Sequence, residues 1–218
     1  MPVVNVPQAL SVGIYGIGAD RYAADPCGRP SLSSGIANLI CSSSPLHARM
    51  AHPKLNPEYV GEEADHFDIG TVAHALILEG YSVAEVLKFP DWRTNAAREA
   101  RDAARKAGKV PILEKNWANV LGMVASARTQ LEAHKDAYGA FTEGKPEQTL
   151  IWEDDGVLCR ARLDWLHDSM VAIDDYKTTS ATANPDAISR TLFANGWDVQ
   201  AAFYIRGLCH LNDNWNAI

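Results

Sequence analysis

The stretch that decides the fold runs from Arg162 to Thr178 and reads RLDWLHDSMVAIDDYKT. It contains two acids, Asp164 and Asp175, that lie eleven residues apart, and Lys177 follows two residues after the second. Carboxylate oxygens are the ligands that Mg²⁺ and Mn²⁺ prefer. A lysine beside such a cation can orient an attacking water and offset the charge that builds on a phosphoryl group. The order acid, acid, lysine therefore indicates metal-assisted chemistry on a phosphodiester.

Alternating side chains on both sides of a short polar break predict a β-hairpin. Residues 157–166 alternate between two faces, one with Cys159, Ala161, Leu163 and Trp165 and the other with Arg160, Arg162 and Asp164. Residues 167–170 form the break, and residues 171–176 resume as a strand. Because side chains repeat every two residues along a strand, Asp175 and Lys177 should point the same way and Asp174 the other way. If the hairpin sets Asp164 opposite Asp175, the two carboxylates can hold one cation.

Three further motifs lie outside the hairpin. Residues 32–40 (LSSGIANLI) and 44–49 (SPLHAR) place serines and a proline where helices start. Residues 70–79 (GTVAHALILE) contain a Gly-x-x-x-His pattern that ends in His74. Residues 200–204 (QAAFY) contain Gln200 and Tyr204 one helical turn apart, so that the two side chains share a face.

In this order, the four motifs resemble the PD-(D/E)XK nuclease superfamily and, more narrowly, the phage recombination exonucleases of the RecE type, which are relatives in fold of lambda exonuclease. The resemblance implies an α/β fold, with a restriction-endonuclease-like mixed β-sheet core flanked by helices. It also implies an exodeoxyribonuclease, a phosphodiester hydrolase that degrades one strand of linear duplex DNA in the 5′-to-3′ direction. The product would be a 3′ single strand for phage homologous recombination.

The resemblance further implies roles for individual residues. Asp164 and Asp175 hold Mg²⁺, for which Mn²⁺ can substitute, while His74 and the backbone carbonyl of Tyr176 supply further metal ligands. Lys177 positions the attacking water, and Gln200 and Tyr204 position the DNA or the active site. Some relatives carry an iron–sulfur cluster held by one cysteine near the front and several at the back. We expect no such cluster and no zinc site here, because the back group and any Cys-x-x-Cys spacing are missing among Cys27, Cys41, Cys159 and Cys209.

Several of these residues also have a plainer interpretation. By itself, a histidine among the apolar residues of a helix is more often a core residue than a metal ligand. Arg160 and Arg162 can contact phosphate as bidentate donors, or they can pair with Asp164, Glu153 or Asp154. Thr178 can donate to the DNA backbone, or it can be an ordinary residue at a strand end.

Composition is that of a soluble domain. The chain has 218 residues, of which 47% are hydrophobic and 22% charged, and this favours one domain over residues 1–218. No apolar run approaches the roughly 20 residues needed to span a bilayer, and residues 1–5 lack the charged flank of a signal peptide. We therefore expect no membrane contact and a location in the cytoplasm of a bacterial host cell.

The net charge of −7 does not exclude DNA as a partner, because the local distribution of charge decides where an anion binds. Between Lys88 and Lys109, seven basic and three acidic residues give a local charge of +4. Arg98, Arg101 and Arg105 lie there at helical spacing. They can contact DNA, or they can form a solvated helix surface with local ion pairs.

The remaining pattern predicts an irregular lead over residues 1–30, helices over 33–51, a loop over 53–68 and the His74 helix to about Val86. A helical insertion over 94–136 follows, with helices at 94–107 and 114–136. A strand starts at Thr149, Asp155-Gly156 forms a hairpin turn, and helices cover Pro185–Ala194 and Val199–Leu211. The related fold has a further strand after the Gln-x-x-x-Tyr helix, whereas this sequence stops at Ile218. Either it is a fragment, or the natural protein is short.

Two other functions fit the same motifs. The first is a nuclease of the superfamily that acts on single strands or cuts internally. The second is a non-catalytic remnant that binds DNA or a recombination partner. For the leading function, the expected partners are ends of double-stranded DNA, a single-strand annealing protein and a second copy of the chain.

Overall fold

The computed structural model describes residues 8–60, 67–80 and 84–212. The chain forms two compact units. The first, the sheet unit, comprises residues 1–61, 147–175 and 179–218, and the second, the helical unit, comprises residues 62–146 and 176–178. Because the two units are interleaved in sequence, this division does not test the prediction of one domain over residues 1–218.

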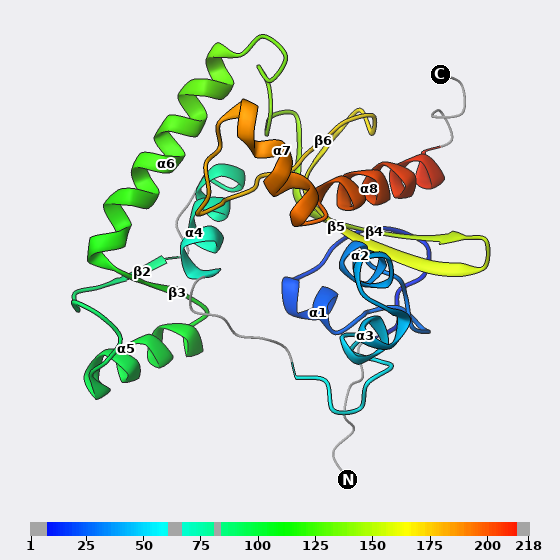
Figure 1. The fold of residues 1–218 in the computed structure, drawn as a ribbon, viewed down its shortest axis with the longest axis horizontal. Helices are drawn as coiled ribbons and strands as arrows, with labels where there is room; N and C mark the ends of the chain where they lie inside the picture. Colours follow the sequence, from blue (N-terminus) through cyan, green and yellow to red (C-terminus); the bar gives the residue numbers. More distant parts are fainter. Residues whose placement is uncertain (1–7, 61–66, 81–83, 213–218) are drawn as a thin grey trace. The chain divides into compact units, whose positions relative to one another are not determined.

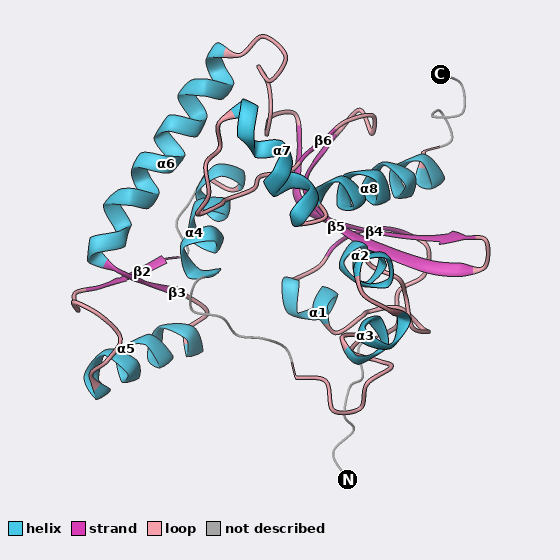
Figure 2. Ribbon diagram, in the orientation of Figure 1, coloured by secondary structure: helices cyan, strands magenta, loops and turns pink. Residues whose placement is uncertain are grey.

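Within the described residues, four strands form the sheet in the order β1-β4-β5-β6. They are β1 (Gly13–Gly16), β4 (Gly144–Asp154), β5 (Val157–His167) and β6 (Ile173–Asp174). Figure 2 shows β4 and β5 as the two long neighbouring strands. The pairs β1–β4 and β5–β6 are antiparallel. Between β4 and β5, Asp155 and Gly156 have φ angles of 48° and 79°, as a two-residue type I′ hairpin turn requires. The predicted turn at Asp155-Gly156 is confirmed. The predicted hairpin is also confirmed, as the antiparallel pair β5–β6.

Helices of the same unit accompany this sheet in the part of the chain that the structure describes (Figure 1). They are α1 (Ala19–Ala23), α2 (Ser34–Ser42), α3 (Pro45–Met50), α7 (Pro185–Ala194) and α8 (Trp197–Leu211). The Ser33 side chain accepts a hydrogen bond from the backbone of Ile36, and the Ser44 side chain accepts one from the backbone of His47. These caps satisfy amide groups that would otherwise lack a partner at the helix start. The predicted starts of α2 and α3 are therefore confirmed.

The core of the sheet unit lies between the sheet and α8. Leu150, Trp152, Ala161 and Leu163 pack with Tyr204 and Leu208 in one buried cluster. Gly207 allows the close approach of the helix, because a Cβ atom at this position would lie 2.7 Å from the Trp152 ring. A second cluster, formed by Cys27, Ile151 and Leu158, contains residues of the lead as well as of β4 and β5.

The helical unit contains α4 (Phe67–Leu78), β2 (Ala84–Leu87), α5 (Asn95–Lys106), β3 (Val110–Leu113) and α6 (Glu114–Ala133) (Figure 1). Strands β2 and β3 pair in parallel, with Ala84 opposite Val110. Helix α5 provides the crossover between them, as parallel strands require. Among the described residues, no helix is long and apolar enough to cross a membrane.

The mixed α/β class is as predicted, but several boundaries are corrected. The lead is not wholly irregular, since it contains β1 and α1. The His74 helix ends at Leu78, where Gly80 has a left-handed φ of 68°, and β2 follows in place of a longer helix. The predicted helical insertion contains the strand β3. In each case the strand partner is distant in sequence, and packing against that partner outweighs the local pattern. Residues 1–5, most of the second half of the predicted loop and the chain end at Ile218 lie outside the described residues.

Candidate active site

The hairpin brings the two predicted metal carboxylates together. In the β5–β6 ladder, Trp165 pairs with Asp174 and Leu166 with Ile173. Asp164 and Asp175 are the next residues beyond the Trp165–Asp174 pair, and Asp175 itself lies directly after β6. Both carboxylates also act on one side chain of α8: burial raises the pKa of Tyr204, and the charges of Asp175 and Asp164 raise it further. The two acids therefore lie near the same part of α8.

Helix α8 supplies the other side chains of this site. Gln200 donates a hydrogen bond of 2.5 Å from its Nε2 to the hydroxyl of Tyr204, and Tyr204 is 6% exposed. A cavity of about 110 Å³ is lined by Asp175, Gln200 and Tyr204 together with Ile173, Ala201 and Ile205. The predicted Gln-x-x-x-Tyr pair thus lines the same cavity as one of the two acids.

Asp174 belongs to different surroundings. Its carboxylate lies 2.7 Å from Nε2 of His167, a residue of β5. This contact agrees with the prediction that Asp174 and Asp175 point in opposite directions.

The predicted alternation along β5 does not extend to the end of the strand. Leu163 and Leu166 are three residues apart, yet both belong to the buried cluster under α8. Strict alternation would place them on opposite faces. Arg160 and Asp164, four residues apart on this strand, have different neighbours: Arg160 contacts Ser31, and the charge of Asp164 acts on Tyr204.

Arg160, which was predicted to contact DNA or a nearby acid, is buried and has its partners inside the protein. The residue is 3% exposed. Its Nη1 donates to the carbonyl and the hydroxyl of Ser31 at 2.8 and 2.7 Å and lies 3.4 Å from Asp25. The acids predicted as its alternative partners include Glu153 and Asp154, which pair instead with Arg29 and Arg206.

Arg162, the next residue on the same predicted face, has a partly exposed side chain. It pairs with Glu147 and donates a 2.7 Å bond to the carbonyl of Ile17. The sequence predicted that Arg162 contacts a phosphate or pairs with Asp164, Glu153 or Asp154. The two contacts found are with other residues.

Lys177 lies in a segment without regular structure, because β6 ends at Asp174 and not at the predicted Tyr176. Strand periodicity therefore does not reach Lys177, and its shared direction with Asp175 stays a prediction. Residues 176–178 group with the helical unit. There Thr178 approaches α4 so closely that a Cβ atom on Gly70 would lie 3.0 Å from the threonine hydroxyl.

This contact explains the glycine of the Gly-x-x-x-His motif. His74 is half-buried and lies one helical turn after Gly70, so the two residues share a face of α4. Gly70, which shares a helix face with His74, therefore lies close to Thr178 in the segment that also carries Lys177. All these residues belong to the helical unit. Sequence reasoning assigned no role to Gly70, although its spacing from His74 was a usable signal.

The residues of the hairpin fit a hard divalent cation. Mg²⁺ is usually held by one or two carboxylates together with waters and substrate phosphates. Two aspartates on neighbouring strands supply this donor set. Within residues 8–60, 67–80 and 84–212, no three His, Cys, Asp or Glu side chains gather into a complete protein-only metal site.

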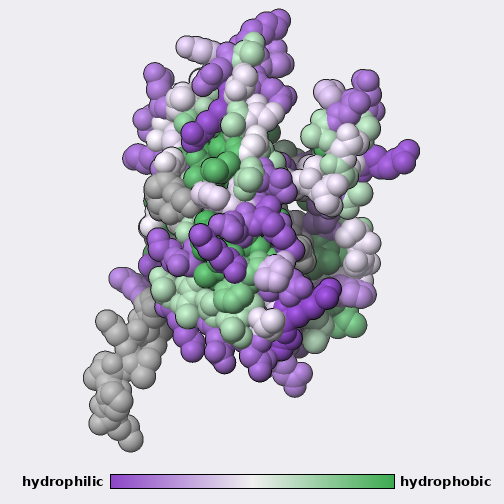
Figure 3. All heavy atoms as spheres, turned by 90° about the vertical axis from the view of Figure 1, so that its left-hand side faces the viewer, coloured by the Kyte–Doolittle hydropathy of each residue, from purple (hydrophilic) through white to green (hydrophobic). Residues whose placement is uncertain are grey.

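The basic residues on α5 already have local partners. Arg98 donates to the backbone carbonyls of Trp92 and Arg93, and Arg101 bonds Asp102 at 3.3 Å. Arg101 also lies 6.0 Å from the centre of the Trp92 ring, within the range of a cation–π contact. On the face of the helical unit that contains α5, hydrophilic side chains spread over the surface and apolar ones show between them (Figure 3). These contacts agree with the interpretation of α5 as a solvated helix, whereas DNA contact by Arg98, Arg101 and Arg105 stays a prediction.

Comparison with known proteins gives one family. No curated protein and no solved structure matches the chain. A family described as a PDDEXK-like domain of unknown function matches residues 41–215, which include the acidic hairpin, the His74 helix and α8. The chain therefore belongs to this PDDEXK-like family, and membership indicates a nuclease-type function with DNA as the substrate and a divalent metal as the usual cofactor.

Proposed function

We propose that the protein is a metal-dependent exonuclease that hydrolyses phosphodiester bonds of linear duplex DNA from a 5′ end and leaves a 3′ single strand. The observation that supports the proposal is that Asp175 lines one cavity with Gln200 and Tyr204, and that the charges of both Asp164 and Asp175 act on Tyr204. The RecE-type resemblance supports the polarity and the role in phage recombination.

The charge arrangement favours a bound cation. Like charges directly opposite each other on neighbouring strands are destabilising. A divalent ion between Asp164 and Asp175 would convert this repulsion into attraction on both sides. When bound, Mg²⁺ or Mn²⁺ would supply stabilisation for the attacking and leaving oxygens of the phosphodiester.

The residues of the chain have the following roles in the proposed reaction. Asp164 and Asp175 hold the cation, and His74 and the Tyr176 carbonyl are further ligands. Lys177 orients the attacking water and donates to the phosphoryl oxygens. Gln200 fixes the Tyr204 hydroxyl, whose raised pKa keeps it protonated and able to donate at neutral pH.

Contacts to the DNA backbone come from the remaining polar residues in this proposal. Thr178 donates from its hydroxyl, and Arg98, Arg101 and Arg105 give α5 a positive surface for phosphates. Further partners of the proposed enzyme are a single-strand annealing protein and a second copy of the chain, and its location is the bacterial cytoplasm.

The proposal is tested by digestion of linear duplex DNA with a label at either end, carrying a 5′ phosphate or a 5′ hydroxyl, with and without Mg²⁺. We expect mononucleotides to appear from the 5′ end only when the metal is present. A covalently closed circle of the same sequence should stay intact. Cleavage of the circle would indicate an endonuclease, and no metal-dependent release from any substrate would indicate a non-catalytic protein.

A further inference from the structure

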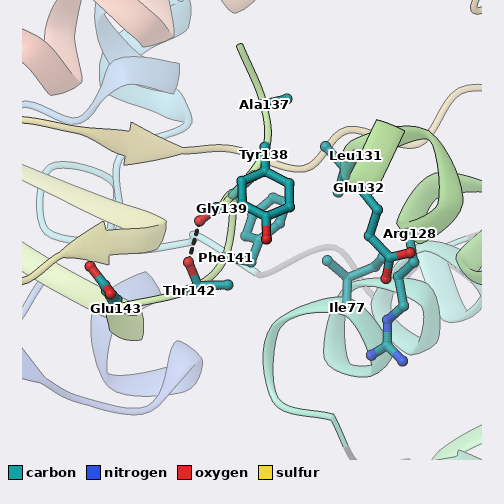
Figure 4. A pocket seen from close by; sticks show the side chains of 11 residues that line it. Ile77, Arg128, Leu131, Glu132, Ala137, Tyr138, Gly139, Phe141, Thr142 and Glu143 are labelled. Carbon is teal, nitrogen blue, oxygen red and sulfur yellow. Dashed lines mark hydrogen bonds between the residues drawn. The ribbon is translucent and has the colours of Figure 1, made fainter. Parts of the chain in front are cut away.

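A second cavity lies wholly within the helical unit, at the end of α6. Its volume is about 590 Å³, in the range of roughly 300–1,000 Å³ that is usual for sites of small organic groups. The walls come from the ends of α4 and α6 and from the loop 137–143. Figure 4 shows Tyr138 and Phe141 on the loop, across from Ile77, Arg128 and Glu132 on the helices.

The loop that presents the aromatic residues has an unusual backbone. Phe141 and Glu143 have φ angles of 57° and 44°, a region that residues other than glycine seldom occupy. Thr142 bonds the carbonyl of Gly139 across the turn at 2.5 Å. Such strained conformations persist where the surrounding structure holds them, and they are frequent at binding sites.

Tyr138 is the most exposed large aromatic residue beside this cavity. It is 78% exposed, although an aromatic ring of this size is usually partly buried. An exposed ring at the edge of a cavity offers a planar face on which another planar group can stack. Phe141 adds a second aromatic ring to the same lining.

The charges of the lining exclude a phosphate as the preferred ligand. Two carboxylates, Glu132 and Glu143, lie around the cavity against one guanidinium, that of Arg128. One nitrogen of this guanidinium already donates to the Leu76 carbonyl at 2.5 Å. The lining therefore suits a neutral planar group with its own donors and acceptors, which is the chemistry of a nucleobase.

We propose that this cavity is a subsite for one unpaired nucleobase of a single DNA strand, stacked on Tyr138. The inference rests on the proposed function, because a nuclease that degrades one strand of a duplex exposes unpaired bases on the other strand. Carboxylate and guanidinium groups on the helix side meet the polar edge of the base, while the phosphates of the strand stay outside.

Binding without cleavage tests the subsite. The full chain is titrated in calcium, at one fixed salt concentration, with an oligodeoxyadenylate and with an oligomer of abasic sites of equal length. Tyr138→Ala should weaken binding of the oligodeoxyadenylate by about tenfold, as expected for the loss of one base–aromatic stack. Binding of the abasic oligomer should not change. Tyr138→Phe keeps the ring and should bind both oligomers as the wild type does.

Three controls make the result specific. Tyr59→Ala removes another exposed tyrosine, one that lies in the sheet unit, and should leave both affinities unchanged. A melting curve confirms the fold, which should survive because Tyr138 is mostly exposed. Free deoxyadenosine should compete only weakly with the oligomer.

Three results would overturn the subsite: an unchanged affinity of Tyr138→Ala for the oligodeoxyadenylate, an equal loss on the abasic oligomer, or deoxyadenosine binding as tightly as the oligomer. The digestion assay is scored separately. Cleavage without base-dependent binding would contradict only the subsite. Base-dependent binding without cleavage would contradict only the exonuclease activity.

Discussion

The buried Asp25, which contacts Arg160 of β5, can be compared with the hairpin pair Asp164 and Asp175. The comparison concerns how the charge of each is balanced. On one side, Asp25 is completely buried beside Arg160. Its carboxylate accepts bonds from the backbone and hydroxyl of Ser31 at 2.9 and 2.8 Å and from the backbone of Cys27 at 3.2 Å. Burial alone would raise the pKa of Asp25, but Arg160 and the bonds from Ser31 outweigh it and lower the pKa.

The other group is the hairpin pair, Asp164 and Asp175. In the β5–β6 ladder Trp165 pairs with Asp174, so Asp164 and Asp175 are the next residues along the two chains. Their charges act outward and contribute to the raised pKa of Tyr204. Arg160 balances the charge of Asp25 within the protein, whereas we expect a bound cation to contribute to the charge balance at the proposed metal ligands Asp164 and Asp175.

The largest expected effect separates these two groups by activity. Asp164→Ala or Asp175→Ala should reduce metal-dependent cleavage below detection, because each change removes a ligand and the charge stabilisation that depends on it. The fold should survive, since each variant also removes a like-charge repulsion. Cleavage of end-labelled duplex and a melting curve measure both expectations.

Asp174→Ala is the matched control for the hairpin. It lies next to Asp175, but its carboxylate bonds His167, so cleavage should stay close to that of the wild type. An essential Asp174 together with a dispensable Asp175 would show that the active register is shifted by one residue.

Lys177→Ala should have the next largest effect. It removes a positioned cation but no metal ligand, so cleavage should fall by about 10²–10³, the usual result of losing one transition-state donor. Affinity for duplex DNA in calcium should stay nearly unchanged. Single-turnover rates and a binding titration of the same variant measure the two quantities, and turnover near that of the wild type would remove Lys177 from the chemistry.

Asp25→Asn tests the other side of the comparison, through stability. The amide keeps the shape, and asparagine tolerates the left-handed φ of 59° at this position, but the charge of Arg160 loses its partner. Breaking a buried ion pair in this way costs about 3–5 kcal/mol in the free energy of unfolding. Denaturant titration measures this loss. Asp154→Asn, at a pair whose arginine, Arg206, is exposed, should cost less than Asp25→Asn.

The pH dependence of the free energy of unfolding tests whether the Asp25 carboxylate stabilises the fold. Because the folded-state pKa of Asp25 is lowered from its ordinary 3.8, its stabilisation is present above that value and is lost as pH falls through the lower folded-state pKa. Wild-type stability should therefore decrease in acid below about pH 4. The Asp25→Asn variant should lack this part of the decrease, and parallel acid slopes for the two proteins would contradict the assignment.

The sequence predicted the elements whose signals are local. Pro185–Ala194 forms α7 with the bounds expected, and the Asp155-Gly156 turn fixes the β4–β5 hairpin. The β5–β6 hairpin followed from the same kind of signal, because its register depends on a short polar break.

Features that depend on distant partners were missed. Arg160 was expected to reach phosphate or a nearby acid, but its partner is Asp25, far earlier in the chain. Strand β1 pairs with β4, and β2 with β3, across long separations, and neither short segment has a strong pattern of its own. Spacing between side chains along one strand does not reveal which segment covers its face.

The smallest expected effect concerns His74, which lies in the helical unit and not in the unit that contains the hairpin pair. As a metal ligand, its loss should raise the Mg²⁺ concentration needed for half-maximal cleavage by roughly tenfold or more, as loss of a supporting group at a metal site does. Excess Mg²⁺ should then restore most of the rate, because the two carboxylates remain. His134→Ala, an exposed histidine of the same unit, should leave the metal requirement unchanged. If His74 is instead a packing residue of α4, His74→Ala should lower the melting temperature and leave the Mg²⁺ titration of the surviving enzyme as it was. The metal titration therefore distinguishes two cases. In the first, His74 binds the cation together with Asp164 and Asp175. In the second, only the two aspartates and the substrate bind it.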